Sequence, residues 1–473
     1  MQAMTARSVH AFTDDLARLD AVATTEAVRR GDVSVPEVVE AAIARAEALD
    51  GELGAIATPD FDRARATAAT VTRGPLVGVP TFIKDNMDQV GLPTKEGSKA
   101  LAHARPAKAN GGVTAQLLDM GMISLGKSSL PEFGFAPSCE TLDGTATRNP
   151  WNLDHTTGGS SAGAAALVAA GVVPVAHGAD GGGSIRIPSA CCGLVGLKVS
   201  RGRLVPDLGS KLMPVDIVTE GLLTRSVRDL ALHLAEAEKR YRKRSLPAVG
   251  HVTAPVRRSL RIGVVTEAPL GAGLDAANQQ ALKETVALLE ELGHQVTPIT
   301  FPGVEAFAAD FLQYWSMLIW TVVNQGQRLF DPSFDKTQMT PFSLMMAQRF
   351  RDQIRTAPAN IVRMRGYQRT YRAMYQSCDV VLAPTLATVA PPIGHLASDM
   401  DGEILLERLT DWMPFTPLAN GTGLPAISLP MGHDDELGLP VGMMFQADLG
   451  ADALLVELAL QLEAAHPWRT LAP

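Results

Sequence analysis

Residues 178–188 read Gly-Ala-Asp-Gly-Gly-Gly-Ser-Ile-Arg-Ile-Pro and follow a strand-like apolar segment at residues 172–176. Three consecutive glycines before Ser184 permit backbone conformations that other residues resist, and they leave N–H groups unobstructed. An acyl-transfer enzyme needs such donors, aimed at a negative charge that develops beside a serine oxygen. A flexible turn or a phosphate-binding loop is the alternative. Neither the Gly-Lys-Ser/Thr of Walker loops nor the dinucleotide-binding glycine pattern fits these residues.

A second cluster of glycine and serine, Gly-Gly-Ser-Ser-Ala-Gly, occupies residues 158–163. A serine is a weak nucleophile until a base activates it. His155 and His177 are the histidines nearest to the two clusters, but neither lies in a Gly-x-Ser-x-Gly turn with an ordered acid behind it. The histidine route is therefore not favoured.

Lys84 offers the other route, because it follows an apolar strand-like segment at residues 77–83. Burial disfavours the charged form of a lysine and lowers its pKa, so a buried Lys84 would be able to act as a base. The alternative for a single lysine is a surface charge or an ion pair, for example with Asp85. The two serine clusters downstream favour the catalytic interpretation.

Strand-like and helical patterns alternate along the chain. A Ser-Val-Pro-Glu sequence at residues 34–37 predicts a capped helix start within a helical stretch at residues 14–70. Residues 261–266, 275–292 and 296–299 predict a strand, a helix and a strand in succession. Strands are also expected at residues 379–384 and 426–430, and a helix at residues 451–464. This alternation favours an α/β architecture with a mixed, mostly parallel twisted sheet covered by helices on both faces.

The composition narrows the class of protein. The 473 residues are 46% hydrophobic and 19% charged, with a net charge of −8 and scattered basic residues, which disfavours a nucleic-acid partner. Four cysteines form no metal-binding spacing. Residues 1–15 carry no apolar signal-peptide core, and the longest apolar run is shorter than the ~18 residues of a membrane span. We expect a soluble cytoplasmic protein that needs no metal or cofactor.

Together these motifs resemble those of the amidase signature family. The matching pieces occur in the family's order over roughly residues 20–465, and they are specific. They lie at residues 74–86, 91–94, 131–134, 144–151, 158–161, 180–188, 193–198, 379–385, 423–430 and 438–442. The resemblance implies one large domain at residues 71–465 with a helical segment at residues 1–70 packed against it. The family-like core would span about residues 74–200.

The resemblance also implies a mechanism for hydrolysing a carboxamide C–N bond through an acyl-enzyme. Lys84 would be the base, Ser160 the relay on a cis peptide bond, and Ser184 the nucleophile. The oxyanion hole would be formed by backbone N–H groups of Gly181, Gly182, Gly183 and Ser184. Asp180 and Arg186 would support the loop as a charge-assisted pair.

The substrate pocket is expected in the family's variable regions, at about residues 200–225 and 305–375. A loop around Phe133, Phe135 and Ala136 should contribute as well. These regions are rich in Met, Phe and Leu, which favours a small apolar or aromatic substrate. An aromatic and methionine stripe at helical spacing, formed by Phe311, Trp315, Met317 and Trp320, is either core or pocket wall.

Other functions remain open at this point. The same serine–serine–lysine site would also serve a carbamate (urethane) or ester hydrolase. An amidotransferase subunit working with a partner protein is a different class. Residues 201–221 lack the Tyr-Gly-Leu and Ser-Ser-Leu-Asp-Gln stretch of such subunits. A catalytically inactive binding protein is disfavoured because Lys84, Ser160 and Ser184 are all present. We expect a free-standing monomer or homodimer that acts on a small molecule.

Overall fold

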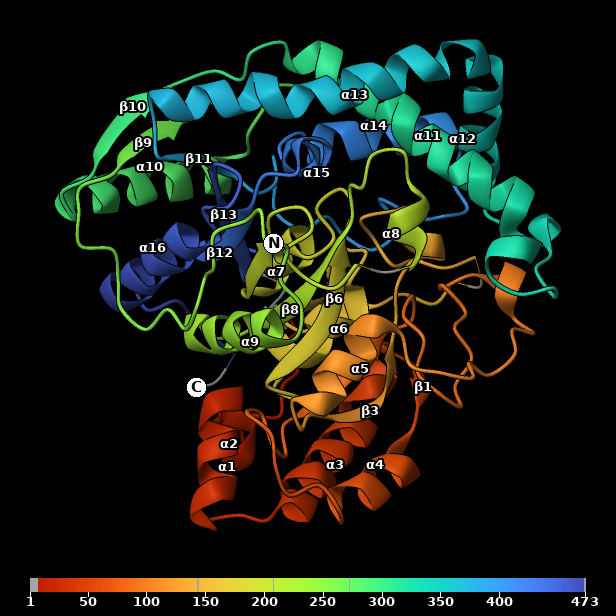
Figure 1. The fold of residues 1–473 in the computed structure, drawn as a ribbon, viewed down its shortest axis with the longest axis vertical. Helices are drawn as coiled ribbons and strands as arrows, with labels where there is room; N and C mark the ends of the chain where they lie inside the picture. Colours follow the sequence, from red (N-terminus) through yellow and green to blue (C-terminus); the bar gives the residue numbers. More distant parts are fainter. Residues whose placement is uncertain (1–6, 143, 207, 272, 472–473) are drawn as a thin grey trace, which may run out of the picture.

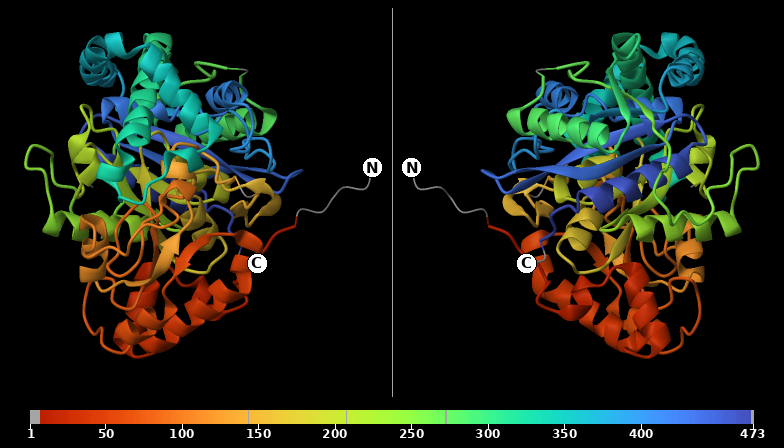
Figure 2. Two further views of the ribbon diagram at one scale, coloured as in Figure 1. Left: turned by 90° about the vertical axis from the view of Figure 1, so that its right-hand side faces the viewer. Right: turned by 90° about the vertical axis from the view of Figure 1, so that its left-hand side faces the viewer.

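The computed structural model describes residues 7–471 apart from residues 143, 207 and 272 (Figure 1). Residues 1–6, which belong to the predicted N-terminal segment, lie outside the described residues. The N-terminal helices and the helices α11–α13 lie at opposite ends of the molecule, with the large sheet between them (Figure 2).

The N-terminal segment is helical, as predicted, except for one strand. Ser34 caps α3 by accepting a hydrogen bond from the Glu37 backbone at 3.3 Å, and Glu37 accepts one from the Ser34 backbone at 2.7 Å. Asp50 then accepts hydrogen bonds from the N–H groups of Ala55 and Ile56, which turns the chain out of the helix into a strand. The elements are α1 (Asp15–Arg18), α2 (Ala21–Arg30), α3 (Val35–Leu53), β1 (Ile56–Pro59) and α4 (Phe61–Ala68).

A small three-stranded sheet connects this segment to the rest of the chain. It has the order β1-β3-β2, in which β2 (Pro80–Lys84) is parallel and β1 antiparallel to β3 (Ile123–Ser128). Every residue of β2 and β3 is buried, including the lysine near the end of each strand. Lys84 is the last residue of β2, so the strand delivers its side chain to the interior.

The large sheet has eight strands in the order β10-β9-β11-β13-β12-β7-β8-β6. The predicted mixed α/β architecture is confirmed, and the βαβ unit pairs β9 and β10 in parallel as expected. Parallel pairing is less extensive than expected, because all pairings from β11 to β6 are antiparallel. The strands are β6 (Val175–Asp180), β7 (Val195–Lys198), β8 (Thr219–Thr224), β9 (Arg261–Val264), β10 (Gln295–Pro298), β11 (Val380–Pro384), β12 (Ala426–Asp434) and β13 (Leu439–Ala447).

The way the chain connects these strands explains why most of the pairings are antiparallel. β12 and β13 form a hairpin, and a hairpin reverses the chain without the crossover helix that parallel neighbours need. β8 lies between β6 and β7, so two strands of like direction are not direct neighbours. A short separate hairpin joins β4 (Arg148–Asn149) and β5 (Asn152–Thr156).

Buried side chains of the helices gather in two main hydrophobic clusters. One includes α6 and α7, whose residues are all buried, together with residues of α3, α12 and α14. The other includes α9, α10 and α16. The remaining helices are α5 (Gly112–Asp119), α6 (Ala162–Ala169), α7 (Arg186–Cys192), α8 (Leu208–Leu212), α9 (Val227–Arg240), α10 (Ala276–Glu291), α11 (Val304–Leu329), α12 (Pro341–Asp352), α13 (Ala357–Arg372), α14 (Gly402–Trp412), α15 (Pro417–Thr422) and α16 (Asp452–Ala465).

Helix α11 is the longest of the described helices. By length and composition it could cross a membrane, with a mean hydropathy of 1.2 over its most apolar window. In the fold it packs against α12 and α13, and 44% of that window is buried (Figure 1). Its apolar face forms part of the wall of a cavity inside the protein, described below.

Candidate active site

A cavity of about 1450 Å³ contains Lys84, Ser160 and Ser184 on its wall. The predicted pocket residues Phe133, Phe135 and Ala136 also line it. So do parts of both predicted variable regions, including residues 209–210, residues 212–214 and one face of α11. Two further wall segments were not predicted from the sequence, at residues 104–112 and 406–418.

Lys84 is 2% exposed, and its Nζ donates to Ser160 Oγ at 2.7 Å and to the carbonyl of Ala179 at 3.3 Å. Burial lowers the pKa of Lys84 to about 8, although Glu220 and other nearby acidic groups oppose the shift. Asp85 pairs with Lys127 at 2.9 Å and not with Lys84. No ion pair of the Lys84 amine is found among the described residues, and the amine lies within proton-transfer distance of a serine.

Ser160 is positioned by glycines on the chain before it. The Gly159–Ser160 peptide bond is cis, and Gly158 has a φ of +69°. A Cβ at Gly159 would lie 3.0 Å from the backbone of Pro137, so this close approach requires glycine. Ser161 follows and joins the two serine clusters, because its N–H donates to the carbonyl of Ser184 at 3.2 Å.

Ser184 lies just before α7 and is half-buried on the cavity wall. No hydrogen bond joins its hydroxyl to Ser160 within the part of the chain that the structure describes. The structure thus brings Lys84 and Ser160 into direct contact and places Ser184 on the same cavity. Catalytic hydrogen bonds are often long without substrate and shorten when it binds.

One of the predicted oxyanion donors in the glycine loop already has a hydrogen-bond partner. Gly183 donates its N–H to Asp180 Oδ1 at 2.8 Å, and Gly183 is not part of the cavity wall, unlike Gly181, Gly182 and Ser184. The prediction that Gly183 contributes a donor is therefore not supported by its hydrogen bonding. The reason is local: the Asp180 carboxylate turns back onto the loop that follows it.

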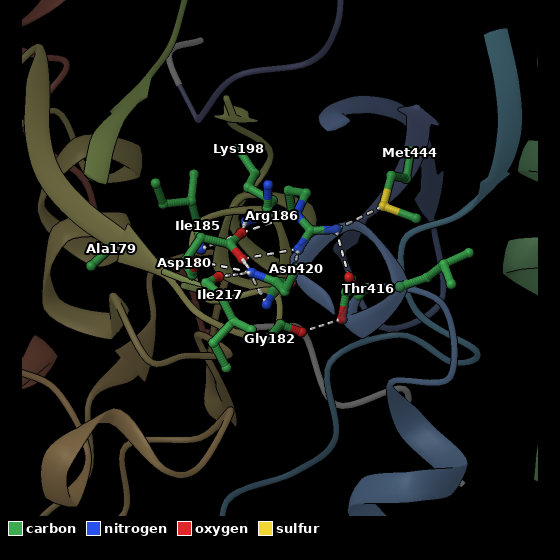
Figure 3. Close-up of polar contacts among 12 residues, drawn as sticks. Ala179, Asp180, Gly182, Ile185, Arg186, Lys198, Ile217, Thr416, Asn420 and Met444 are labelled. Atoms are coloured by element: carbon green, nitrogen blue, oxygen red, sulfur yellow. Dashed lines mark hydrogen bonds and ion pairs between the residues drawn. The ribbon is translucent and has the colours of Figure 1, made fainter. Parts of the chain in front are cut away.

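Asp180 and Arg186 form the buried pair that the sequence predicted, with both side chains inaccessible and 2.9 Å between Arg186 Nη2 and Asp180 Oδ1 (Figure 3). The Arg186 guanidinium holds the pKa of Asp180 well below its usual range. Asn420 donates to the Asp180 carbonyl at 2.9 Å, and Thr416 donates to the Gly182 carbonyl at 2.7 Å. These two residues, one just before α15 and one within it, hold the glycine loop in place. Neither was predicted from the sequence. Asn420 gave one signal, as a polar residue within the short Ala-Asn-Gly stretch of an otherwise apolar segment.

The loop around Phe133 is held by Glu132, which was also missed. The Glu132 carboxylate accepts hydrogen bonds from the Thr340 backbone at 2.9 Å, from Ser343 Oγ at 2.6 Å and from Ser98 Oγ at 2.8 Å. Phe133 has a φ of +48°, and its ring contacts those of Phe135, Phe330 and Phe334. Glu132 thereby ties a pocket loop to α12.

The stripe on α11 divides between pocket and core. Phe311, Trp315 and Met317 line the cavity, whereas Trp320 is absent from the wall and packs on Phe350 at a ring distance of 5.6 Å. Phe301, Phe307 and Phe415 add further aromatic surface to the cavity. Among the described residues, no group of three or more His, Cys, Asp or Glu side chains is arranged to hold a metal ion.

Fold and cavity together define an enzyme of mixed α/β architecture, with a lysine and two serines on one buried wall. Residues 37–456 match the model of the family described as Amidase. The chain belongs to the amidase signature family and is an amidase, a hydrolase that acts on non-peptide C–N bonds of small amides.

Relatives with names and solved structures agree with this assignment. The chain is 48% identical to AmiC of Mycobacterium tuberculosis (strain ATCC 25618 / H37Rv) over 464 residues, covering 97% of each protein. It is 33% identical to the 6-aminohexanoate-cyclic-dimer hydrolase of Paenarthrobacter ureafaciens, covering 96% of each. A solved bacterial aryl acylamidase of the amidase signature family superposes with a TM-score of 0.85 at 27% identity, covering 96% of this chain and 98% of that one.

Proposed function

We propose that Ser184 is the nucleophile, Ser160 the proton relay and Lys84 the base of this amidase. Neutral Lys84 accepts the Ser160 proton while Ser160 accepts the Ser184 proton, and Ser184 Oγ attacks the amide carbonyl. The same relay returns a proton to the nitrogen of the leaving amine, and water then hydrolyses the acyl-enzyme. The observation that carries this proposal is the 2.7 Å contact between Lys84 Nζ and Ser160 Oγ in the wall of the cavity that also holds Ser184.

The tetrahedral oxyanion needs donors that are already in place. We assign this role to backbone N–H groups of Gly181, Gly182 and Ser184, which line the cavity. Gly183 is left out because its N–H is engaged by Asp180. Thr416 and Asn420 support the loop from behind, so the donors are held before the substrate arrives.

We propose that the substrate is an amide with a bulky apolar or aromatic group. Aromatic, leucine and methionine side chains dominate the wall of the cavity, and its 1450 Å³ exceeds the roughly 300–1,000 Å³ of most small-molecule sites. Two relatives named above carry names that refer to a cyclic amide dimer and to aryl acylamides. A large apolar cavity suits both kinds of substrate. A carbamate or an ester would present the same carbonyl to Ser184.

A matched set of chromogenic substrates tests this assignment. It comprises an aryl amide, an aryl carbamate and an aryl ester of similar size, each assayed with wild type and Ser184→Ala. We expect turnover of the amide by wild type and none by the variant, and the ranking of the three substrates defines the preferred bond. Turnover by Ser184→Ala equal to wild type would disprove the nucleophile. If no substrate is cleaved, covalent labelling of Ser184 by a fluorophosphonate still reports whether it is activated.

A further inference from the structure

A buried histidine and a buried glutamate lie directly behind Lys84. His177, on β6, is fully buried, and its Nδ1 accepts the backbone N–H of Lys84 at 3.2 Å. A ring nitrogen that accepts a hydrogen bond carries no proton, so the proton of a neutral His177 is on Nε2. Nε2 lies 2.9 Å from Glu220 Oε2 and donates to it. The chain of contacts therefore runs from the Lys84 backbone through His177 to Glu220.

Glu220 is paired across the sheet with a residue that contacts the amine of Lys84. It lies on β8 directly opposite Ala179 of β6, and the Ala179 carbonyl is the second acceptor of Lys84 Nζ. Residues paired in this way have side chains on the same face of a sheet. Glu220 also belongs to the wall of the catalytic cavity. Strand pairing thus brings its carboxylate to the part of the cavity that holds the lysine.

The second carboxylate oxygen of Glu220 has no hydrogen-bond partner among the described residues. Glu220 is 2% exposed, and its Oε1 is buried without a donor. An ionised carboxylate is costly to bury unless a positive charge lies nearby. His177, whose Nδ1 accepts the Lys84 N–H, supplies one hydrogen bond to this carboxylate from Nε2. The protonated form of Lys84 is a nearby cation that can stabilise this carboxylate.

Other acidic groups also face Lys84, but most are neutral or already paired. Asp180 is paired with Arg186 at 2.9 Å. Asp85 is paired with Lys127, and burial raises the pKa of the Cys139 thiol to about 11, which keeps it neutral. Glu96 lies on the cavity wall in the loop after β2 and also favours the charged lysine. Glu220 makes the largest of these contributions to the pKa of Lys84.

We propose that Glu220, held in place by His177, is a positioning residue that stabilises the protonated Lys84 formed during catalysis. The proposal rests on the proposed function, in which Lys84 is the base. When Lys84 accepts the Ser160 proton and Ser160 accepts the Ser184 proton, the lysine becomes an ammonium ion beside the Glu220 carboxylate. The proton then leaves through Ser160 to the amine product, and Glu220 exchanges no proton. Its role is to make the lysine a stronger proton acceptor at a buried site.

Removing the charge of Glu220 has two consequences that a purely structural residue would not produce. The acidic limb of the pH profile of kcat/KM should move to lower pH, because Lys84 loses its proton more easily. The plateau rate should fall, because the ammonium ion is less stable as it forms. Opposite charges at short range shift a pKa by about 1–3 units, so we expect the limb to move by about one pH unit.

The experiment compares pH profiles of wild type, Glu220→Gln, Glu220→Asp and Glu238→Gln on one cleaved substrate. Glu220→Asp keeps the negative charge, so the acidic limb of its kcat/KM profile should stay near the wild-type pH. Glu238→Gln removes a largely buried carboxylate of α9 that pairs with Arg203 and lies outside the cavity wall, so it should leave the limb at the same pH. If the limb of Glu220→Gln coincides with that of wild type, the proposal is wrong. If Glu220→Gln does not fold, the acidic limb is compared in Glu220→Asp and in His177→Asn, which removes the residue that holds Glu220. The proposal expects the smaller shift of the limb in Glu220→Asp, and an equal or larger shift there would contradict it.

A direct titration separates this proposal from the assignment of the base. Competitive acetylation followed by mass spectrometry gives the pKa of Lys84 in Ser184→Ala and in Ser184→Ala/Glu220→Gln, without any need for turnover. We expect about 8 in the first and a lower value in the second. If the titration shifts while the pH profile does not, Glu220 acts on Lys84 but Lys84 is not the base. If the titration does not shift, the role of Glu220 is disproved.

Discussion

Three fully buried lysines show why the surroundings of a side chain decide its chemistry. Lys127 is paired with Asp85, and Lys198 donates to the carbonyls of Val199 and Leu424 at 3.0 and 3.1 Å. Burial lowers the pKa of Lys198 to about 7, close to that of Lys84. Of these lysines, Lys84 is the one that contacts a serine hydroxyl on the cavity wall. A lowered pKa alone does not identify a base. The candidate base is the lysine that also contacts a serine on the cavity wall.

The pH dependence of catalysis follows from the state of Lys84. Its neutral form is the base, so kcat/KM should rise tenfold per pH unit up to about pH 8 and then level off. Lys84→Ala should lose about 10²–10⁴-fold in rate and lack this plateau, because positioned general bases contribute factors of that size. Steady-state assays between pH 6 and 10 measure both. A Lys84→Ala enzyme with a near-normal rate at neutral pH would contradict the assignment.

Gly183 is a residue whose substitution should abolish activity through the backbone. Its φ is +134°, and a Cβ there would lie 2.5 Å from Thr416 Oγ1 and 2.7 Å from Ile187 Cδ1. Gly183→Ala should therefore displace the loop from Thr416 and reduce kcat at least 100-fold, the size of effect seen when an oxyanion donor is lost. Gly366→Ala, at an open position on α13, is the control. Equal activity of both variants would show that the loop tolerates the shift.

At this scale the sequence predicted the residues that carry motifs and missed the residues that contact them. Lys84, Ser160 and Ser184 stand within short, specific patterns, and the structure places all of them on one cavity. His177 was set aside because it does not lie in a Gly-x-Ser-x-Gly turn with an ordered acid behind it. Glu220 lies 43 residues away and reaches it only through the pairing of β6 with β8. Contacts of this kind depend on register, which local patterns do not contain.

Among the secondary-structure elements, the short segment around η2 (Glu132–Gly134) has the clearest function, because it carries Phe133 into the pocket. Its position depends on the Glu132 carboxylate, which α12 and Ser98 hold through hydroxyl and backbone donors. Phe133 and Phe135 pack on each other, so a shift of one moves both. The geometry of one side of the pocket thus depends on a contact between elements distant in sequence.

Glu132→Ala should loosen that side of the pocket more than it affects the chemistry. Hydrogen bonds to a charged group contribute about 1.5–3 kcal/mol each, and we expect a loss of about 2 kcal/mol in the free energy of unfolding. KM for an aryl amide should rise several-fold while kcat changes less, because Lys84 and Ser160 do not touch Glu132. Urea unfolding and steady-state kinetics measure the two effects. Glu403→Ala removes an exposed ion pair with Arg349 and should change neither.

Elements with strong terminal signals were predicted most closely. The Ser34 capping box starts α3, and Asp275 caps α10, whose bounds fall within one residue of the predicted helix. β1 was missed because four residues with one exposed face give little periodicity. The antiparallel pairings were missed because apolar runs indicate buried strands without their direction. Direction depends on connections, and the hairpin of β12 and β13 is such a connection.

On the scale of the whole molecule, the active site joins distant parts of one chain. Arg186 of α7 bonds to Asp180 and also to the Thr416 carbonyl and Asn420 Oδ1 next to and within α15 (Figure 3). The cavity wall likewise combines residues 104–112, the Phe133 loop, α11 and residues 406–418. The sequence predicted two variable regions of this wall from family resemblance. The same resemblance predicted the Phe133 loop. Residues 104–112 and 406–418 could not be predicted, because their proximity to the site exists only in the folded chain.

The size and character of the cavity predict how rate should depend on substrate length. Each buried CH₂ contributes about 0.8 kcal/mol, which corresponds to roughly a fourfold gain in kcat/KM per methylene if the contact persists in the transition state. We expect this gain along a series of 4-nitroanilides of straight-chain acids, or along N-alkyl amides if the apolar surface holds the amine part. The gain should continue to long chains, because the cavity measures about 1450 Å³. Leu318→Gln places a polar group on the α11 wall and should flatten the series while leaving the shortest substrate unchanged. If neither series gains with length, or if Leu318→Gln has no effect on the slope, the apolar wall does not bind the substrate, and specificity must come from the polar groups around Lys84.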